Sequence, residues 1–232
     1  WRTKQDERIV SRFDKFIVLT KEDKGYWGNL PNIEVISNAA KFIGDTYSDV
    51  LRHRVIAVGR MDYQKGFDRL ICAWELIQQH EQFKNWHLDI FGQGEWKGML
   101  QQMIDERGLG ASVALNAPTK SIGREYADSA MLVMSSNYEG FPMVMIEAMA
   151  SGLPVVSFDF KCGPKDIIDN NVNGILVHNG DIKGLADAMM RLMGDEELRR
   201  SMSVQARKVV DTYSEETVMK QWVELFESLV EK

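Results

Sequence analysis

"MLVMSSNYEGFPMVMIEAMASGLPVVSF" (residues 131–158) holds two short apolar runs on either side of a longer helical pattern. The runs at 131–136 and 154–158 contain few polar residues, which is typical of strands covered on both faces in a parallel sheet. The segment 142–151 between them predicts a helix that is apolar almost all round and therefore buried. Strand, helix and strand in this order predict a βαβ unit, and with it an α/β architecture.

Two glutamates lie within this apolar unit and need an explanation. Glu139 precedes the predicted helix, and Glu147 stands nearly two turns into it among apolar neighbours. A carboxylate on a buried helix either faces a cavity or carries a large desolvation cost. We expect Glu147 to face a cavity and to accept hydrogen bonds from hydroxyl groups there. Pairing with a buried arginine or lysine is the alternative.

The same alternation of short apolar runs and amphipathic segments extends over the rest of the chain. It predicts a Rossmann-like, doubly wound parallel sheet. The predicted strands are 16–20, 33–37, 54–59, 87–92, 112–116, 131–136, 154–158 and 174–178. The predicted helices are 67–80, 96–107, 121–128, 142–151, 164–169 and 182–193.

The two ends of the chain predict further elements and a division into domains. Residues 1–14 predict a helix with a mixed-charge face, and 195–232 predict two helices with a break near "DTYSEE". The polar segment 37–54 lacks a strong period and indicates a linker. Because 1–38 holds too few elements to close its own core, we expect it to be the remnant of an N-terminal domain. The predicted division is 1–38, an interdomain linker 39–53, a main domain 54–214 and a closing helix 215–232.

Composition and charge exclude several classes of protein. With 232 residues, of which 44% are apolar and 27% charged, the chain can bury a substantial core and does not resemble a disordered segment. The net charge of -6 argues against a nucleic-acid partner. The sequence contains no long apolar run and no signal peptide, so we expect a cytoplasmic protein in which Cys72 and Cys162 are reduced thiols.

The loop "VGRMDYQKG" (58–66) follows a predicted strand and carries two cations. In parallel α/β sheets, ligands bind beyond the carboxyl ends of the strands. A guanidinium fork at Arg60 and an ammonium at Lys65 suit the oxygens of a diphosphate in that position. Two solvated surface cations are the alternative, since arginine and lysine are mostly exposed.

The segment "FGQGEWKG" (91–98) resembles a dinucleotide-binding turn but differs from it in spacing. Its glycines stand at 92, 94 and 98, one residue wider than G-x-G-x-x-G. An NAD(P) oxidoreductase is therefore disfavoured. The remaining interpretation is a turn between strand and helix, where glycines let a ligand or another backbone approach closely.

The start of the predicted helix at 142 offers a second group for an anion. Gly140 permits a tight turn, and Pro142 suits the first helical position, where a missing N–H costs nothing. Free N–H groups at residues 141, 143 and 144 lie at the positive end of the helix dipole, which suits a phosphate. Glu139 and Glu147 would then hold sugar hydroxyls on either side of that phosphate.

Other chemistries lack support in the sequence. None of the four histidines stands in a zinc-ligand spacing, and the D-x-D, P-loop and G-x-S-x-G motifs are absent. Lys161 and Lys165 lie near the same predicted cleft, but solvated lysines are the favoured interpretation. We expect neither a metal nor a cofactor.

Taken in order, these motifs resemble a known family. They are G-R-x-x-x-x-K-G, F-G-x-G, E-G-F-P-x-V-x-x-E-A-M-A-x-G-x-P-V-V and G-P-x-x-I-I-x-x-x-x-N-G-I-L-V. Over about residues 54–230 the chain resembles the C-terminal half of a GT-B-fold, retaining glycosyltransferase of family GT4. Residues 1–38 resemble the last elements of the N-terminal domain of such an enzyme, and 215–232 resemble the helix that packs back on that domain.

The resemblance implies roles for individual residues. Arg60 and Lys65 would bind the donor diphosphate, Glu147 the ribose and Glu139 the donor sugar, and Arg60, Lys65 and Glu139 would take part in catalysis. The loop 116–121 would bracket the base, although the family often has glycine where Ala117 stands. The implied donor-binding positions are Arg60, Lys65, Gly92, Gly94, Ala117, Glu139, Gly140, Phe141, Pro142, Met143, Val144 and Glu147. Such enzymes typically need no metal, in agreement with the absent D-x-D motif.

The implied reaction moves a sugar, with retention, from a nucleoside-diphosphate sugar to an acceptor such as a growing glycan or a lipid-linked saccharide. The acceptor site would lie on an N-terminal domain, so we expect this chain to bind donor and to transfer little alone. Alternatives are a non-catalytic nucleotide-sugar-binding module and a GT-B epimerase acting on UDP-N-acetylglucosamine. We also expect an exposed apolar face that favours dimers of this chain, and a full-length protein working in the cytoplasm, at the inner face of the membrane.

Overall fold

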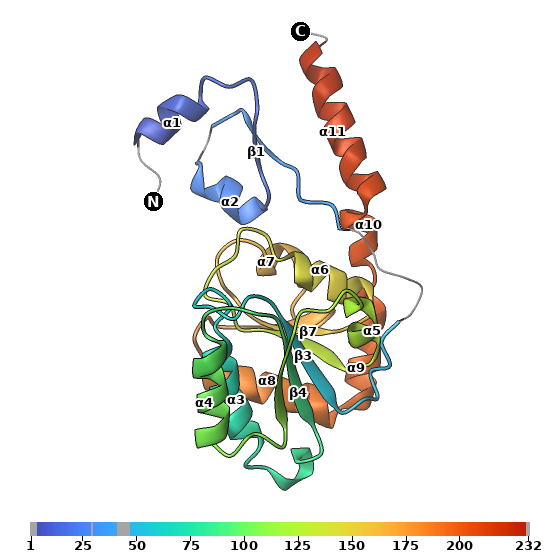
Figure 1. The fold of residues 1–232 in the computed structure, drawn as a ribbon. Coiled ribbons are helices and arrows are strands. Elements are labelled where there is room, and N and C mark those ends of the chain that lie inside the picture. Colours follow the sequence, from blue (N-terminus) through green and yellow to red (C-terminus); the bar gives the residue numbers. More distant parts are fainter. Residues whose placement is uncertain (1–3, 29, 41–46, 231–232) are drawn as a thin grey trace.

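The computed structural model describes residues 4–28, 30–40 and 47–230, and Figure 1 shows that they form two units. The larger unit is a parallel sheet flanked by helices. The smaller unit is formed by the N-terminal elements and lies beside the long C-terminal helix α11 (Glu215–Val230). The fold is α/β, as the alternation of strands and helices predicts.

The described residues contain all eight predicted strands. Six of them form one parallel sheet in the order β5-β4-β3-β6-β7-β8, and the other two, β1 and β2, pair in parallel by themselves. Several strands end one or two residues earlier than predicted. The strands of the large sheet are β3 (Arg54–Val58), β4 (His87–Phe91), β5 (Val113–Asn116), β6 (Met131–Met134), β7 (Val155–Phe158) and β8 (Gly174–Val177).

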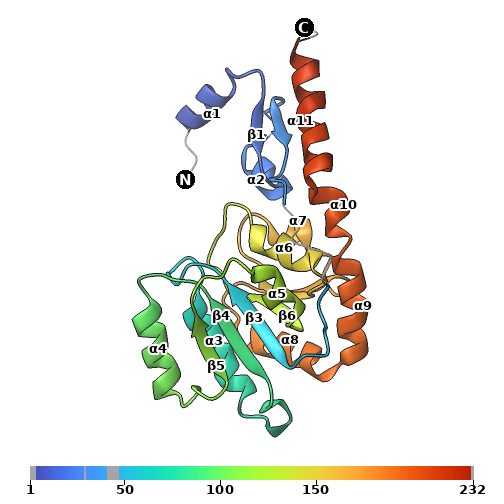
Figure 2. The same cartoon turned by 45° about the vertical axis from the view of Figure 1, so that its right-hand side comes forward.

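Helices cover the two faces of the large sheet. On one face α3 packs between α4 and α8, and α5 and α6 lie on the other (Figure 2). This arrangement follows from right-handed crossovers between parallel strands. All six predicted helices are confirmed: α3 (Phe67–Ile77), α4 (Lys97–Glu106), α5 (Ile122–Ala127), α6 (Met143–Ala150), α7 (Pro164–Ile167) and α8 (Ile182–Gly194), with a short 3₁₀ turn at Glu81–Phe83.

The order of the strands reverses between β3 and β6. From β3 the chain proceeds outward through β4 to β5, then returns to β6 and proceeds the other way to β8. All loops that leave the carboxyl ends of these parallel strands gather at one edge of the sheet. In doubly wound sheets the crevice at such a reversal is the usual ligand site.

The smaller unit consists of α1 (Lys4–Val10), β1 (Phe16–Val18), α2 (Lys21–Tyr26) and β2 (Ile33–Val35). Within the described residues α1 ends at Val10, four residues earlier than predicted. Three buried side chains, of Val10, Val18 and Ile33, form the core of this unit. Since this cluster is small, the unit depends on its contacts with the larger one.

The two units are joined by hydrogen bonds between acidic side chains and backbone N–H groups. Asp166 in α7 accepts the N–H groups of Lys21 (2.6 Å) and Glu22 (3.4 Å), which begin α2. Glu22 in return accepts the N–H of Cys162, just before α7, at 2.7 Å. Thr20 caps the next N–H of α2 at 2.9 Å. The first amides of α2, which lack partners within the helix, are thereby satisfied.

The C-terminal region forms three helices, whereas the sequence predicts two. They are α9 (Glu196–Ala206), α10 (Val209–Tyr213) and α11. The predicted break lies at Ser214, and a second break at residues 207–208 was not predicted. Helix α11 exposes Met219, Val223 and Phe226 on its surface. These side chains are a candidate for the apolar face expected from the sequence, and both that face and dimer formation through it stay predictions.

The segment 39–53, predicted as a linker, is described in part, and its residues 41–46 lie outside the described residues. Ala40 donates its backbone N–H to Tyr213 O in α10 at 2.9 Å, and Ser48 donates its own to Ser151 O, just after α6, at 2.8 Å. Val50 is buried. The described parts of this segment therefore pack on the larger unit.

Candidate functional site

Two loops meet at the reversal of strand order. The loop 59–66 follows β3 and the loop 135–142 follows β6. Asn137 donates its backbone N–H to Gln64 O at 2.8 Å, and Ser135 Oγ donates to Lys65 O at 3.0 Å. These bonds fix the two loops relative to each other, so that their side chains share one site.

Lys65 and Glu139 form a largely buried ion pair across these loops. Lys65 Nζ lies 2.6 Å from Glu139 Oε1, and the two side chains are 14% and 7% exposed. Ser136 Oγ donates to the same oxygen at 2.7 Å, and Gln64 Nε2 donates to Oε2 at 2.9 Å. A carboxylate accepts about four hydrogen bonds and an ammonium donates three. Three acceptor sites of Glu139 and one N–H of Lys65 are in use among the described residues, and the remainder are available to a ligand.

Arg60 extends into solvent at the edge of the same group. Its side chain is 71% exposed, and its Nε lies 3.3 Å from Asp62 Oδ2. Its terminal nitrogen donates to Gln64 Oε1 at 2.9 Å. Gln64 therefore connects Arg60 to Glu139. The two predicted cations lie on one loop, as the sequence indicates, but only Lys65 is buried.

A cavity of about 390 Å³ opens beyond Gly59 and Arg60. Neither Lys65 nor Glu139 lines it, but the Lys65 side chain packs against Gly59, which does. The backbone at Gly59 and Gly92 forms one part of its wall, and Thr119, Tyr126 and Glu147 contribute other parts. The Glu147 carboxylate has no ion pair or hydrogen bond within the described part of the chain, and burial raises its pKa above the usual 4.5. The alternative of a buried arginine or lysine partner is thereby wrong. An unpaired carboxylate at a cavity is an acceptor for donors such as hydroxyl groups.

Tyr126 is a residue of this cavity that sequence reasoning missed. Its side chain is 1% exposed, and its hydroxyl has no hydrogen-bond partner among the residues described. Burial, and secondly the negative charge of Glu147, raise the pKa of Tyr126, so the hydroxyl keeps its proton. An aromatic residue on a short amphipathic helix is ordinarily part of the core. No sequence signal distinguishes Tyr126 from such a residue.

The start of α6 differs in detail from the prediction. Pro142 caps the helix and Met143 is its first residue, one position later than predicted. The N–H of Met143 is not free, because it donates to Phe141 O at 3.0 Å. The N–H groups of Phe141 and Val144 have no acceptor in the described ranges, so two of the three predicted donors remain.

The predicted glycine and loop positions occupy different surroundings. A Cβ at Gly92 would lie 1.8 Å from Gly59 O, and one at Gly94 would lie 2.2 Å from Met61 O. Both glycines therefore permit close approach of another backbone segment. Gly140 has open space around a Cβ and no positive φ, so the loop itself does not require glycine there. Ala117 is exposed, and its neighbours Pro118 and Thr119 line the cavity in its place.

Two further lysines follow β7. Lys165 Nζ pairs with Asp159 Oδ2 at 2.9 Å and is 58% exposed. Lys161 Nζ lies 5.4 Å from the centre of the Tyr26 ring. Both take part in local contacts outside the cavity, and the favoured interpretation of solvated lysines is consistent with the exposure of Lys165.

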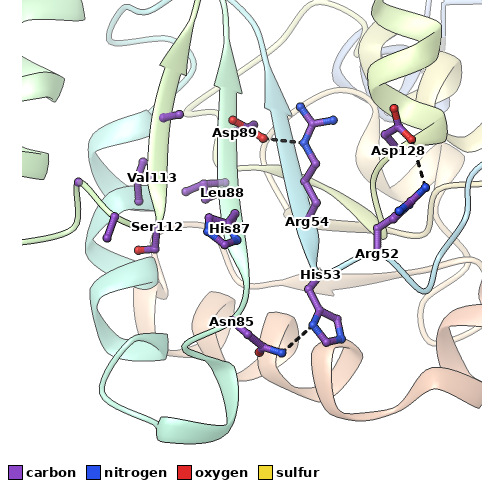
Figure 3. Close-up of a pocket in the computed structure, with 13 residues that line it drawn as sticks. Arg52, His53, Arg54, Asn85, His87, Leu88, Asp89, Ser112, Val113 and Asp128 are labelled. Carbon is purple, nitrogen blue, oxygen red and sulfur yellow. Dashed lines mark hydrogen bonds and ion pairs between the residues drawn. The ribbon is translucent and has the colours of Figure 1, made fainter.

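A second and larger cavity, of about 500 Å³, lies over the amino ends of β3, β4 and β5 (Figure 3). Its charged side chains point toward one another. Arg54 contacts Asp89 at 2.6 Å, and Arg52 lies 3.9 Å from Asp128. Arg54 also contacts Glu125 at 2.7 Å. Because its charges are paired internally, this cavity is the weaker candidate for an ionic ligand despite its size.

The described residues contain neither a metal-ligand cluster nor a membrane-spanning helix. No three or more His, Cys, Asp or Glu side chains gather there as metal ligands would. None of the helices that the structure describes combines the length and the apolar character needed to cross a membrane.

Comparison with known proteins identifies relatives of the chain. A family model described as glycosyl transferases group 1 matches residues 48–209. The amylovoran biosynthesis glycosyltransferase AmsD of Erwinia amylovora is 35% identical over 219 residues, which cover 90% of this chain and 61% of that protein. The poly(ribitol-phosphate) alpha-N-acetylglucosaminyltransferase of Staphylococcus aureus is 33% identical, over 97% of this chain and 47% of that protein. The chain thus spans about half to three fifths of the length of these two relatives.

Solved structures agree with the sequence comparison. A complex of S. aureus TarM with Fondaparinux, alpha-GlcNAc-glycerol and UDP matches with a TM-score of 0.84 and 31% identity, over 96% of this chain and 46% of that one. The fold thus matches GT-B glycosyltransferase structures. With the family match over most of the large unit and the predicted motifs at the reversal of strand order, the chain belongs to the glycosyl transferases group 1 family.

Proposed function

We propose that this chain is the donor-binding half of a retaining glycosyltransferase of family GT4. It binds a nucleoside-diphosphate sugar, and the sugar passes to a glycan or a lipid-linked saccharide. The observation that carries the proposal is that one loop, 59–66, supplies Lys65 to the ion pair with Glu139 and supplies Gly59 and Arg60 to the cavity in which the Glu147 carboxylate has no partner among the described residues. Two comparisons support the proposal. The TarM complex contains UDP, and the S. aureus protein that is 33% identical to this chain is named as an N-acetylglucosaminyltransferase.

The unused hydrogen-bonding capacity of these groups suits the parts of such a ligand. Lys65 has two N–H groups for diphosphate oxygens, and Glu139 has one acceptor site for a hydroxyl of the donor sugar. Both oxygens of Glu147 are available to the two neighbouring hydroxyls of a ribose. The loop 116–121 lies where it can contact the base, since Pro118 and Thr119 line the cavity.

Positive groups near the diphosphate would assist its departure. When the bond between sugar and diphosphate breaks, negative charge grows on the leaving group. Lys65, Arg60 and the free N–H groups of Phe141 and Val144 can stabilise that charge without a metal. Removing one fixed donor of this kind from an enzyme typically costs about 3–4 kcal/mol of transition-state stabilisation.

Acceptor binding belongs to parts of the protein beyond this chain in our proposal. The chain spans 61% and 47% of two transferring relatives. We therefore expect donor binding with little transfer by residues 1–232 alone. Detection of efficient transfer by this chain would contradict that expectation, and release of a free or epimerised sugar would favour an epimerase.

Isothermal titration of the chain with UDP, GDP and ADP, and with their sugars, tests the proposal. One of the three nucleotides, together with its sugars, is expected to bind with a stoichiometry of one ligand per chain. In the double variant Lys65→Met/Glu139→Gln, which removes both charges of the pair together, the affinity is expected to fall about a hundredfold, or ~2.7 kcal/mol. Lys183→Met, which removes an exposed cation paired with Asp187, is the control and keeps the affinity. Absence of binding for every nucleotide, or unchanged affinity in the double variant, overturns the proposal.

A further inference from the structure

The Tyr126 hydroxyl is an unsatisfied polar group in the wall of the candidate site. The side chain is 1% exposed, and its hydroxyl has no partner within the part of the chain that the structure describes. A buried hydroxyl without a hydrogen bond is unfavourable and rare in folded proteins. A phenylalanine would fill the same space without this cost. Packing of the ligand-free protein therefore does not explain why a hydroxyl is present at this position.

The position of Tyr126 separates it from the other buried polar atoms without partners. Five described side chains carry such an atom. Arg69 donates through its terminal nitrogens, Asn32 donates through Nδ2, and the second oxygen of Asp159 pairs with Lys165. The Arg207 guanidinium lies over the Tyr47 ring. Tyr126 is the member of this group that lines the cavity with Glu147, and the hydroxyl is its only polar side-chain atom.

Tyr126 and Glu147 reach the cavity from different helices. Tyr126 comes from α5 and Glu147 from α6, and the apolar parts of α5 and α6 join the main core. The hydroxyl is a protonated donor, and the carboxylate is an acceptor that lacks a donor. Among the residues lining the cavity, Arg60 is the only other charged side chain, and it extends toward solvent. The Glu147 carboxylate is the anionic acceptor in this wall, and its charge acts on Tyr126.

We propose that Tyr126 is a positioning residue of the nucleotide site, whose hydroxyl donates a hydrogen bond to Glu147 when a nucleotide occupies the cavity. The inference rests on the proposed function, in which Glu147 binds the sugar of the nucleotide. Bound nucleotide excludes water from the cavity, and a hydrogen bond to a carboxylate strengthens in such surroundings. The bond fixes the carboxylate oxygens toward the ligand hydroxyls. Its formation also satisfies the hydroxyl, which adds to the affinity.

The test compares Tyr126→Phe with the unchanged chain in thermal unfolding and in titration with whichever of UDP, GDP and ADP the unchanged chain binds, with UDP standing for that nucleotide below. The affinity for UDP is expected to fall about tenfold, which corresponds to ~1.4 kcal/mol. The melting temperature is expected to stay the same or to rise, because the ligand-free protein loses no hydrogen bond. A purely structural tyrosine would give the opposite pattern, with a lower melting temperature and an unchanged affinity, and that result overturns the inference.

A double-mutant cycle with Glu147→Leu, which removes both acceptor oxygens, tests whether the hydroxyl acts through the carboxylate. Tyr126→Phe is expected to cost about tenfold in the unchanged chain and less than about threefold when Glu147 is already replaced. Equal costs in both backgrounds mean that the hydroxyl acts independently of Glu147, which overturns the positioning role.

Ser112→Ala is the matched control, because it also removes a buried hydroxyl but at the opposite end of the sheet. Ser112 Oγ accepts from Trp74 Nε1 at 3.1 Å and donates to Leu109 O at 3.4 Å. We expect it to lower the melting temperature and to leave UDP affinity unchanged. If the unchanged chain binds none of UDP, GDP and ADP, the proposed function and this inference both fail. If it binds one of these nucleotides and Tyr126→Phe binds the same nucleotide equally well, only the inference fails.

Discussion

The two ends of the large sheet both carry a cavity and charged side chains, but they differ in how those charges are used. At the amino ends of the strands, Arg54 is held by Asp89 and Glu125 at 2.6 and 2.7 Å. At the carboxyl ends, the Glu147 carboxylate and the Tyr126 hydroxyl have no partner in the described residues. The smaller cavity, of about 390 Å³ against 500 Å³, is therefore the one with hydrogen-bonding groups left to offer a ligand.

The difference separates charges that maintain the fold from groups that await a ligand. In a paired charge, the partner within the protein offsets the cost of removing the charge from water. An unpaired buried group lowers the stability of the fold until a ligand forms a hydrogen bond with it. Substitutions at the two ends should accordingly change different measured quantities. At the amino end they should change the free energy of unfolding, and at the carboxyl end chiefly the affinity for a nucleotide.

The largest effect is expected for Lys65→Met, because this residue serves both purposes. The change leaves Glu139 as an uncompensated buried charge and should lower the free energy of unfolding by about 3 kcal/mol. Adding Glu139→Gln should restore most of that loss in urea unfolding, while nucleotide affinity stays low. If the single and double variants are equally unstable, the ion pair is not the source of the effect.

The next largest effect is expected for Arg54→Met at the amino end. Two carboxylates lose their partner, and we expect the free energy of unfolding to fall by about 2 kcal/mol. The UDP affinity of the folded protein should not change in titration. The neighbouring Arg52→Met is the control, since its side chain is 58% exposed and its loss should cost less than about 0.5 kcal/mol. A large change in UDP affinity with Arg54→Met would mean that the nucleotide binds at the amino ends of the strands, which contradicts the proposed site.

Glu147→Gln should lower UDP affinity about tenfold while raising stability near neutral pH. Burial raises the pKa of the folded carboxyl above 4.5, so the folded protein binds this proton more tightly than the unfolded chain does. The contribution of the protonated Glu147 carboxyl to the free energy of unfolding is therefore present at acid pH, and it is lost as the pH rises through the pKa of the folded state. Near neutral pH the glutamine variant should melt about 2 °C higher.

Thermal unfolding across pH checks the sign of this effect. The advantage of the glutamine variant should shrink as the pH falls toward 4.5, the usual pKa of the carboxyl. An advantage that is independent of pH would show that desolvation of the carboxylate is not its cause.

The smallest effect is expected for alanine substitutions at two glycines, one at each end of the sheet. Both have open space where a Cβ would lie. Gly140 lies in the loop before α6, and Gly110 lines the amino-end cavity. Alanine at either position should change the free energy of unfolding by less than about 0.5 kcal/mol. Gly140→Ala should weaken UDP binding about threefold, because a methyl group would crowd a ligand there, and Gly110→Ala should not. Equal affinities in the two variants would remove residue 140 from the binding surface.

Much of the fold could be predicted because its signals are local. Apolar runs such as 131–134 and the helical pattern after Pro142 identify strands and helices without knowledge of the rest. The break at residues 207–208 could not be predicted, because neither glycine nor proline marks it and the Arg207 guanidinium packs over the Tyr47 ring, at 4.0 Å from its centre. Such a contact is distant in sequence and leaves no local pattern.

The candidate site shows the same limit at the level of single side chains. The positions of Lys65, Glu139 and Glu147 followed from motifs, loop positions and an apolar helix with one charge. Their mutual arrangement could not be predicted, since the pairing of Lys65 with Glu139 depends on the hydrogen bonds between two loops. Tyr126 was missed because a buried aromatic residue has the same sequence pattern with or without a satisfied hydroxyl. The roles of all these residues stay predictions until the variants are measured.

The contact between α2 and α7 has a consequence for which substitutions the protein tolerates during evolution. Its donors are main-chain amides, of Lys21, Glu22 and Cys162, which almost every residue type supplies. Its acceptors are two particular carboxylates, of Glu22 and Asp166. The side chain at 21 can therefore vary without loosening the junction, whereas Glu22 and Asp166, 144 positions apart in the sequence, must both remain acceptors.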